Sequence, residues 1–170
     1  MNRYYFAYGM NTNVAEMTNR CPNAVSLGRC ILPNFELKFR HHADIDLVPG
    51  SAMEGVLWEI TPECEKALDR LEGYPYYYNK IDVVLEDNTI AMAYIMNVKG
   101  PQIAPTVGYD KCLYEGYLAH GLDVDNLTAH IDMLLQGDYN EDIAMPMYST
   151  CIGLILKGYN DFENKEKQMS

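Results

Sequence analysis

The chain has 170 residues, the size of one domain with a sizeable core, and we expect a single domain over residues 1–160 with a charged, frayed tail over 161–170. Its formal net charge is −11, from 24 acidic residues against 13 Lys and Arg, and this excess repels phosphate backbones. No local basic patch offsets it, so we expect no nucleic-acid partner. The longest apolar runs are too short to span a bilayer, which also argues against a membrane partner.

The five cysteines are scattered along the chain and form no CxxC pair. An odd number of cysteines without such spacing favours reduced thiols, as in cytosolic proteins. The chain opens with MNRYYFAYG, which lacks the pattern of a signal peptide. We therefore expect a cytoplasmic protein. The sequence pattern does not indicate an oligomeric state.

The first part of the chain predicts a strand, a turn and a helix. Residues 3–8, RYYFAY, are largely apolar on both faces, which is typical of a central strand or of a strand in a closed barrel. Gly9 ends this strand, and polar residues after it can cap a short helix that runs to about Arg20. Further strands are expected at 24–32, 35–41 and 53–60, with a break at Pro33-Asn34 and a loop over 42–52.

The clearest helix start lies at Thr61. Thr61 is a good N-cap, Pro62 suits the first helical position, and the acidic residues that follow favour the positive end of the helix dipole. The predicted buried stripe of this helix consists of Cys64, Ala67, Leu68 and Leu71.

The second half of the chain predicts a hairpin and then helices. Residues 78–86 alternate between apolar and polar side chains, Asp87-Asn88 turns the chain, and residues 89–97 run back as a more buried strand. Two helices and an apolar segment that fits either a strand or a helix are expected further on, at 108–120, 124–136 and 143–159.

One acidic residue stands where a helix must end. The stretch LDRLEGYPYYY at 68–78 places Glu72 directly before Gly73 and Pro75, a combination typical of a helix stop. A carboxylate there faces the negative end of the helix dipole, which disfavours it. A solvated Glu at a helix end is the commoner case. The tyrosines that crowd residues 74–78 nevertheless make a proton-transfer site the sharper hypothesis.

A second feature is the turn YGMNTN at 8–13, between the first strand and the first helix. Backbone amides in such a turn, beside a helix N-terminus, can bind a carboxylate or an oxyanion without a charged side chain. Taken alone, an ordinary capped turn is the more frequent explanation. The turn and Glu72 together favour a site.

Other kinds of site find no support in the sequence. His41 and His42 are adjacent, which is poor geometry for joint metal ligation. They follow a predicted strand and could reach the mouth of the site, but ordinary loop residues are the commoner case, and we interpret them so. No GxSxG elbow, catalytic Cys signature, GxGxxG motif or P-loop occurs. We therefore expect neither a metal nor a cofactor.

Three stretches together resemble the γ-glutamylcyclotransferase-like family, which includes plant avirulence-induced proteins and γ-glutamylamine cyclotransferases. YFAYGMNTN at 5–13 is similar to the family's opening strand and substrate-binding loop. Residues 53–78 resemble its strand, helix and catalytic Glu-Gly pair, and TIAMAYIM at 89–96 looks like its next barrel strand. The helices expected at 108–136 resemble the family's later helices more loosely.

The resemblance implies an α+β fold in which a small mixed β-barrel is flanked by helices. It also implies an enzyme of acyltransferase or lyase type that cleaves a γ-glutamyl amine or γ-glutamyl amino acid to 5-oxoproline and a free amine. By that match Glu72 is the catalytic acid/base, and Tyr8, Gly9, Met10 and Asn11 form the loop that binds the substrate carboxylate. We also expect Tyr78, one of the rings that follow Glu72, to bind substrate. Met10 departs from the family, which usually has Ser there, so either backbone amides suffice for binding or substrate choice and activity change.

Base catalysis at neutral pH requires Glu72 to have a raised pKa, because a free Glu has a pKa of ~4.3. The helix C-terminus supplies only ~0.3–1 kcal/mol, so burial must contribute most of the shift. We therefore expect Glu72 to be partly buried beside Tyr8 and one or more rings of residues 76–78.

Two other functions fit the same sequence. One is a binding module that keeps the pocket and holds a small ligand without turnover. The other is an interaction protein that docks a partner through a tyrosine-rich surface.

Overall fold

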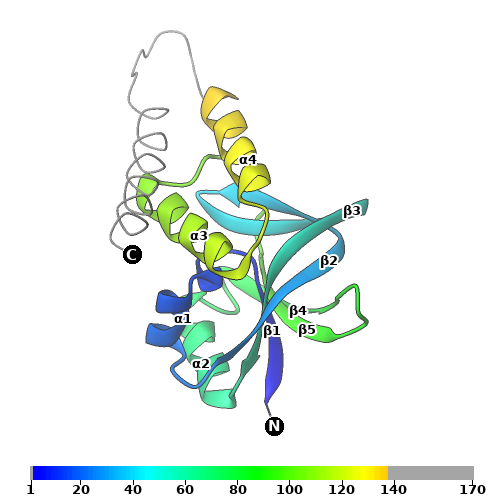
Figure 1. Ribbon diagram of the computed structural model, residues 1–170, viewed down its shortest axis with the longest axis vertical. Helices are drawn as coiled ribbons and strands as arrows, with labels where there is room; N and C mark the ends of the chain where they lie inside the picture. Colours follow the sequence, from blue (N-terminus) through cyan, green and yellow to red (C-terminus); the bar gives the residue numbers. More distant parts are fainter. Residues whose placement is uncertain (1, 138–170) are drawn as a thin grey trace, which may run out of the picture. The chain divides into compact units, whose positions relative to one another are not determined.

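The computed structural model describes residues 2–137 (Figure 1). Contacts divide the chain into two compact units, residues 1–134 and 135–170, and the described strands and helices lie in the first unit apart from the end of α4 (Val124–Gly137). The predictions for residues 143–159 and for the tail at 161–170 lie outside the described residues. The domain boundary at residue 160 stays a prediction.

In the described part of the chain, five strands form one mixed sheet: β1 (Arg3–Ala7), β2 (Val25–Arg40), β3 (His42–Ile60), β4 (Tyr78–Val84) and β5 (Ile90–Met96). Their order is β2-β3-β1-β5-β4, with β1 antiparallel to β3 and parallel to β5. Tyr5, Phe6 and Ala7 are all buried. The central position of β1 confirms the prediction made from its two apolar faces, and β4 and β5 form the expected hairpin.

The predicted loop over 42–52 is wrong, because β3 begins at His42 and pairs with β2 almost along its whole length. The pairing register jumps from Phe35 opposite Leu47 to Pro33 opposite Ala52. The residues between these pairs, which suggested a break and a loop in the sequence, therefore form an irregularity within one long hairpin. The chain reverses at His41, whose φ of 67° lies in the left-handed region.

Among residues 2–137 the sheet does not close into the expected small barrel. β2 and β4 are its edge strands. A backbone hydrogen bond, 3.0 Å long, runs from the Glu86 amide just after β4 to the Ile31 carbonyl in β2 and so brings the two edges together at that point. The α+β class with flanking helices is confirmed, whereas the barrel is left open.

The helices are α1 (Val14–Arg20), α2 (Pro62–Leu71), α3 (Val107–His120) and α4, and a 3₁₀ turn η1 (Met10–Thr12) precedes α1. The expected first helix is thus divided at Asn13, whose side chain accepts hydrogen bonds from two amides of α1 as an N-cap. α1 and α2 lie side by side in Figure 1, and α3 packs against η1. Within residues 2–137, no helix is long and apolar enough to cross a membrane.

The predicted stripe of α2 is buried at Cys64 and Leu68, but Leu71 is 50% exposed, so the stripe is wrong at its last position. Leu71 stands in the final turn, where α2 ends beside a cavity instead of packing on the sheet. The four cysteines among the described residues carry free thiols.

Candidate active site

Glu72 is the C-cap of α2, at the place the sequence predicts. Gly73 follows in the left-handed conformation with a φ of 62°, and the Tyr74 amide donates to the Asp69 carbonyl over 2.9 Å. This backbone bond is typical of a Schellman ending, in which glycine takes the conformation that other residues disfavour. The local sequence therefore fixes where the Glu72 side chain leaves the helix.

The Asn11 side chain holds the Glu72 carboxylate. Asn11 Nδ2 donates to Glu72 Oε1 over 3.1 Å and to the Tyr5 hydroxyl oxygen over 2.9 Å. Arg20 donates to Asn11 Oδ1 over 2.6 Å, and the Trp58 indole donates to the Asn11 carbonyl over 3.0 Å. Asn11 is buried, so η1 presents one rigidly fixed amide to the acid.

The pKa of Glu72 is raised above its ordinary value, and burial is the main cause. The positive charge of Arg20 and the hydrogen bond from Asn11 act in the opposite direction, because both favour the carboxylate. For the half-buried Glu72 side chain, burial and these two partners therefore shift the pKa in opposite directions. Burial moves its pKa towards neutral pH, while its partners keep a charged form accessible.

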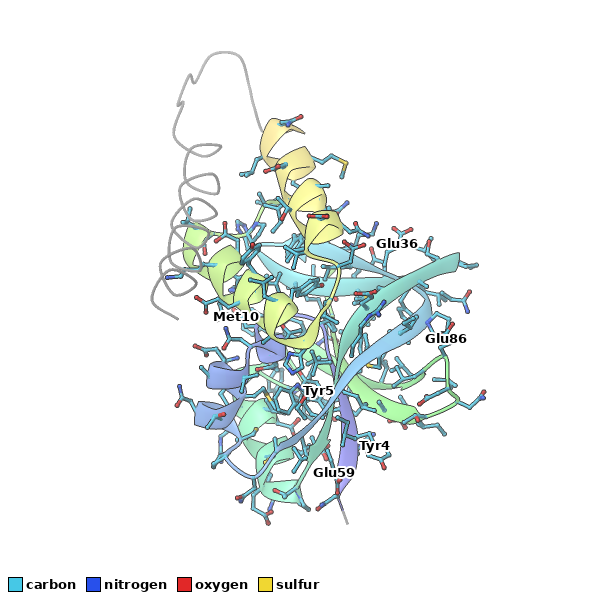
Figure 2. All side chains as sticks on the ribbon, in the orientation of Figure 1. Tyr4, Tyr5, Met10, Glu36, Glu59 and Glu86 are labelled. Carbon is cyan, nitrogen blue, oxygen red and sulfur yellow. The ribbon has the colours of Figure 1, made fainter. Side chains whose placement is uncertain are left out.

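A cavity of about 1110 Å³ brings the predicted site residues together. Its lining contains Glu72 and the five residues expected to bind substrate, namely Tyr8, Gly9, Met10, Asn11 and Tyr78. Figure 2 shows Tyr5 on β1 and Met10 in the turn that follows this strand. Strand β1, the turn after it and the end of α2 therefore contribute to one cavity, although about sixty residues of chain separate them.

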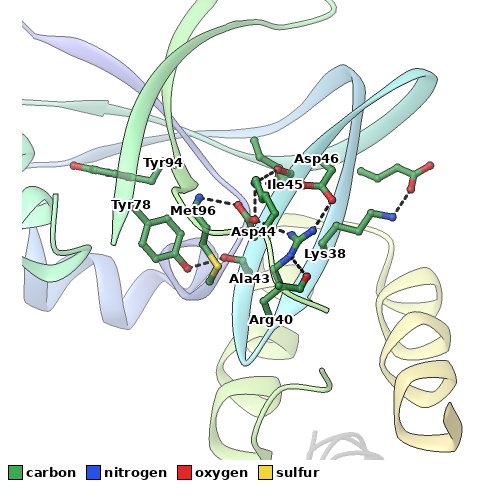
Figure 3. A network of polar contacts seen from close by, with 12 residues as sticks. Lys38, Arg40, Ala43, Asp44, Ile45, Asp46, Tyr78, Tyr94 and Met96 are labelled. Carbon is green, nitrogen blue, oxygen red and sulfur yellow. Dashed lines mark hydrogen bonds and ion pairs between the residues drawn. The ribbon is translucent and has the colours of Figure 1, made fainter. Parts of the chain in front are cut away.

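The hydroxyl groups of Tyr8 and Tyr78 are both bound to backbone carbonyls. Tyr8 donates to the Tyr94 carbonyl over 2.6 Å, and Tyr78 donates to the Ala43 carbonyl over 2.9 Å, as Figure 3 shows for Tyr78. Burial raises the pKa of each hydroxyl, so both stay protonated. These two rings line the cavity, and their hydroxyl hydrogen bonds link Tyr8 to β5 and Tyr78 to β3.

The polar contacts around the cavity extend to Asp44, which is fully buried near the start of β3. Asp44 accepts hydrogen bonds from Arg40 over 2.7 Å and from the Met96 amide over 2.9 Å (Figure 3), and it also accepts one from Lys99 over 2.6 Å. These contacts tie the end of the β2–β3 hairpin to the end of β5 and so fix the position of Ala43 at the cavity.

Sequence reasoning missed Tyr5 and Tyr109. The sequence pattern places Tyr5 only in a strand, yet its hydroxyl lies near Glu72, whose negative charge adds to burial in raising the Tyr5 pKa. Tyr109 joins the cavity from α3, a hundred residues along the chain from Gly9. No local pattern marks either residue. His41 and His42, interpreted as loop residues, are exposed but also line this cavity.

The sequence of residues 5–111 matches the profile of a family described as "Gamma-glutamyl cyclotransferase, AIG2-like". The match covers more than half of the chain. The chain belongs to this family. A search of curated proteins found no match.

Solved structures support the family's fold. A structure named "Gamma-glutamyl cyclotransferase" is 22% identical, with a TM-score of 0.69 over 92% of this chain and 99% of the other. An uncharacterized protein from Homo sapiens is also 22% identical, with a TM-score of 0.68 over 91% and 98% of the two chains. YkqA from Bacillus subtilis is 24% identical, with a TM-score of 0.67 over 78% of this chain and 55% of YkqA.

Proposed function

We propose that this family member cleaves γ-glutamyl amines or γ-glutamyl amino acids to 5-oxoproline and a free amine. The substrate's α-amino nitrogen attacks its own γ-carbonyl carbon and closes a five-membered ring. Glu72 takes the proton that the α-ammonium loses and later gives it to the leaving nitrogen. The turn at residues 9–11 and the rings of Tyr8 and Tyr78 hold the substrate.

One observation carries this proposal. Glu72 is half-buried, has a raised pKa and is hydrogen-bonded to the first turn of the chain, inside a cavity large enough for a substrate. A solvated acid at a helix end would have none of these features. A carboxyl group with a pKa nearer neutral can both accept and return a proton at physiological pH.

The chemistry explains why a carboxylate and a shaped cavity suffice. An intramolecular attack in a well-aligned substrate already gains up to ~7–11 kcal/mol relative to a reaction between separate molecules. The protein must therefore fold the substrate, move one proton in each direction and stabilise the developing negative charge on oxygen.

The test is a panel of γ-glutamyl amino acids and γ-glutamyl-lysine, assayed for 5-oxoproline. Because proton transfer by a positioned group contributes about 10²–10⁴-fold, Glu72→Gln should lower kcat by at least about 10²-fold while the fold persists. Glu86→Gln, at an exposed hairpin position, is the matched control and should keep full activity. Retained turnover in Glu72→Gln would refute the role of Glu72. Binding without 5-oxoproline release would instead identify a small-ligand-binding module.

A further inference from the structure

Two strongly exposed aromatic rings line the candidate active site. Tyr76 and Tyr77 lie in the segment between α2 and β4, and they are 86% and 79% exposed. Both line the cavity that contains Glu72, together with Leu71 and Val98, which are exposed as well. A single exposed apolar residue needs no explanation, but several of them at one cavity mark a place where a ligand or a partner binds.

The backbone that carries these two rings is fixed by hydrogen bonds. The amides of Tyr76 and Tyr77 donate to the Gly73 carbonyl over 2.8 and 3.0 Å. The Asn97 amide donates to the Tyr77 carbonyl over 3.0 Å, and the Asn97 side chain donates to the carbonyls of Pro75 and Tyr76 over 2.6 and 3.0 Å. A tyrosine ring on a fixed backbone offers a large contact area and loses little conformational entropy when it binds.

The two rings lie beside the proposed acid. A Cβ atom on Gly73, the residue after Glu72, would lie 3.1 Å from the Tyr77 ring, so this ring covers the backbone next to Glu72. In the proposed reaction Glu72 gives a proton to the leaving nitrogen, which must therefore lie within hydrogen-bond distance of its carboxylate. The turn at residues 9–11 holds the glutamyl part. The group carried by the leaving nitrogen then extends from Glu72 to the open rim of the cavity, where Tyr76 and Tyr77 lie.

We propose that Tyr76 and Tyr77 bind the group carried by the leaving amine, and that this group is aromatic or large and apolar. This inference rests on the proposed function and narrows its substrates to γ-glutamyl derivatives of aromatic or large apolar amino acids. Such a group stacks on the exposed rings, and the apolar area of both partners is removed from water. A hydrogen atom or a short polar group in its place leaves the two rings in water.

A structural role and a protein partner explain these rings less well. Within residues 2–137 the hydroxyl groups of Tyr76 and Tyr77 have no hydrogen-bond partner, whereas Tyr8 and Tyr78 each donate to a backbone carbonyl. Exposed tyrosines also suit protein interfaces. Here, however, both rings belong to the same cavity of about 1110 Å³ as Glu72, a size and a concave shape typical of sites for small molecules.

The test compares kcat/KM for γ-glutamyl-phenylalanine and γ-glutamyl-glycine, which share both carboxylates and the scissile amide and differ in one benzyl group. We expect the wild type to prefer the phenylalanine compound by at least about 10-fold. An aromatic contact contributes about 2–12-fold, so Tyr76→Ser/Tyr77→Ser should lower this preference by at least about 4-fold. The loss should appear in KM for the phenylalanine compound at unchanged kcat, because the bound substrate and the transition state make the same contacts with the rings.

Two control variants accompany this comparison. Tyr4→Ser removes an exposed tyrosine of β1 that lies outside the cavity, and it should match the wild type with both compounds. Tyr76→Phe/Tyr77→Phe keeps both rings without their hydroxyl groups, and it should keep the preference for the phenylalanine compound.

A double Ser variant that keeps the wild-type preference overturns the inference and leaves the rings to a protein partner. An equal loss with both compounds would show a structural role, and a preference lost in the double Phe variant would show a contact of the hydroxyl groups; either result overturns it too. A wild type that releases 5-oxoproline from both compounds without preferring the phenylalanine compound refutes this inference alone. A wild type that releases no 5-oxoproline from any γ-glutamyl compound refutes the proposed function, and the inference with it.

Discussion

Adding a single methyl group at Gly116 should show how closely α3 packs against the 3₁₀ turn that holds Asn11. A Cβ atom on Gly116 would lie 2.6 Å from the Asn13 nitrogen and from the Thr12 carbonyl carbon, and closer still to Thr12 Oγ1. Two of these three neighbours are backbone atoms, which a change of side-chain rotamer cannot move away. Gly116→Ala must therefore push α3 and the 3₁₀ turn apart.

Two effects of opposite sign set the size of the change. Ala in place of Gly within a helix gains up to about 1 kcal/mol in conformational preference. Overpacking costs about 1–3 kcal/mol, and the upper part of that range applies because backbone must shift. We expect a net loss of about 1–2 kcal/mol in the free energy of unfolding, which lowers Tm by roughly 2–8 °C for a chain of this size.

Thermal unfolding followed by circular dichroism measures this effect. Gly108→Ala is the matched control, because it lies in the same helix and its Cβ would meet nothing within 4 Å. That variant should be as stable as the wild type or slightly more so. A Gly116→Ala protein that unfolds at or above the wild-type Tm would show that α3 does not bear on the turn, and the reasoning would be wrong.

Two further predictions concern Glu72 and pH. Asn11→Ala removes a hydrogen bond that lowers the Glu72 pKa, so the acid limb of the kcat/KM profile should move to higher pH; a limb that stays or moves down would contradict the assignment. Because the folded-state pKa of Glu72 is raised, its ionisation destabilises the native state as pH rises through that pKa. Glu72→Gln should therefore be more stable than wild type to denaturant at neutral pH. This stability gain should vanish below about pH 4, because there an ordinary Glu is protonated in the unfolded chain as well. A stability gain that grows on acidification would refute this prediction.

Much of the site can be predicted because its signals are local. Gly73 and Pro75 stop a helix in any context, so Glu72 can be placed at a helix end from a few residues alone. Thr61 and Pro62 set the start of the same helix in the same way, and the structure confirms both. The two apolar faces of residues 3–8 likewise correctly predict a central strand.

The missed features depend on contacts between distant parts of the chain. The β2–β3 hairpin tolerates Pro33 and Pro49 because an irregular register absorbs them, whereas local propensity favours a break there. Tyr109 reaches the site because Gly116 lets α3 approach the 3₁₀ turn. The pattern of apolar residues within α3 cannot predict this contact, because the turn lies about a hundred residues earlier in the chain. The tyrosines that follow Glu72 predict Tyr78 near the site, but the hydrogen bond from its hydroxyl to the Ala43 carbonyl follows only from the fold.

The same contacts explain why an acid can persist in an unfavourable place. Glu72 faces the negative end of α2 and is half-buried, and both effects raise the free energy of its charged form. Asn11 can offset part of that cost only while η1 stays in place, and η1 is held by Trp58 from β3 and by the close approach of α3 at Gly116. Stability of the turn and the proton affinity of Glu72 are therefore coupled. A change that loosens the turn, such as Gly116→Ala, should therefore raise the Glu72 pKa as well as lower Tm, and a kcat/KM profile that stays at the wild-type pH in that variant would contradict this coupling.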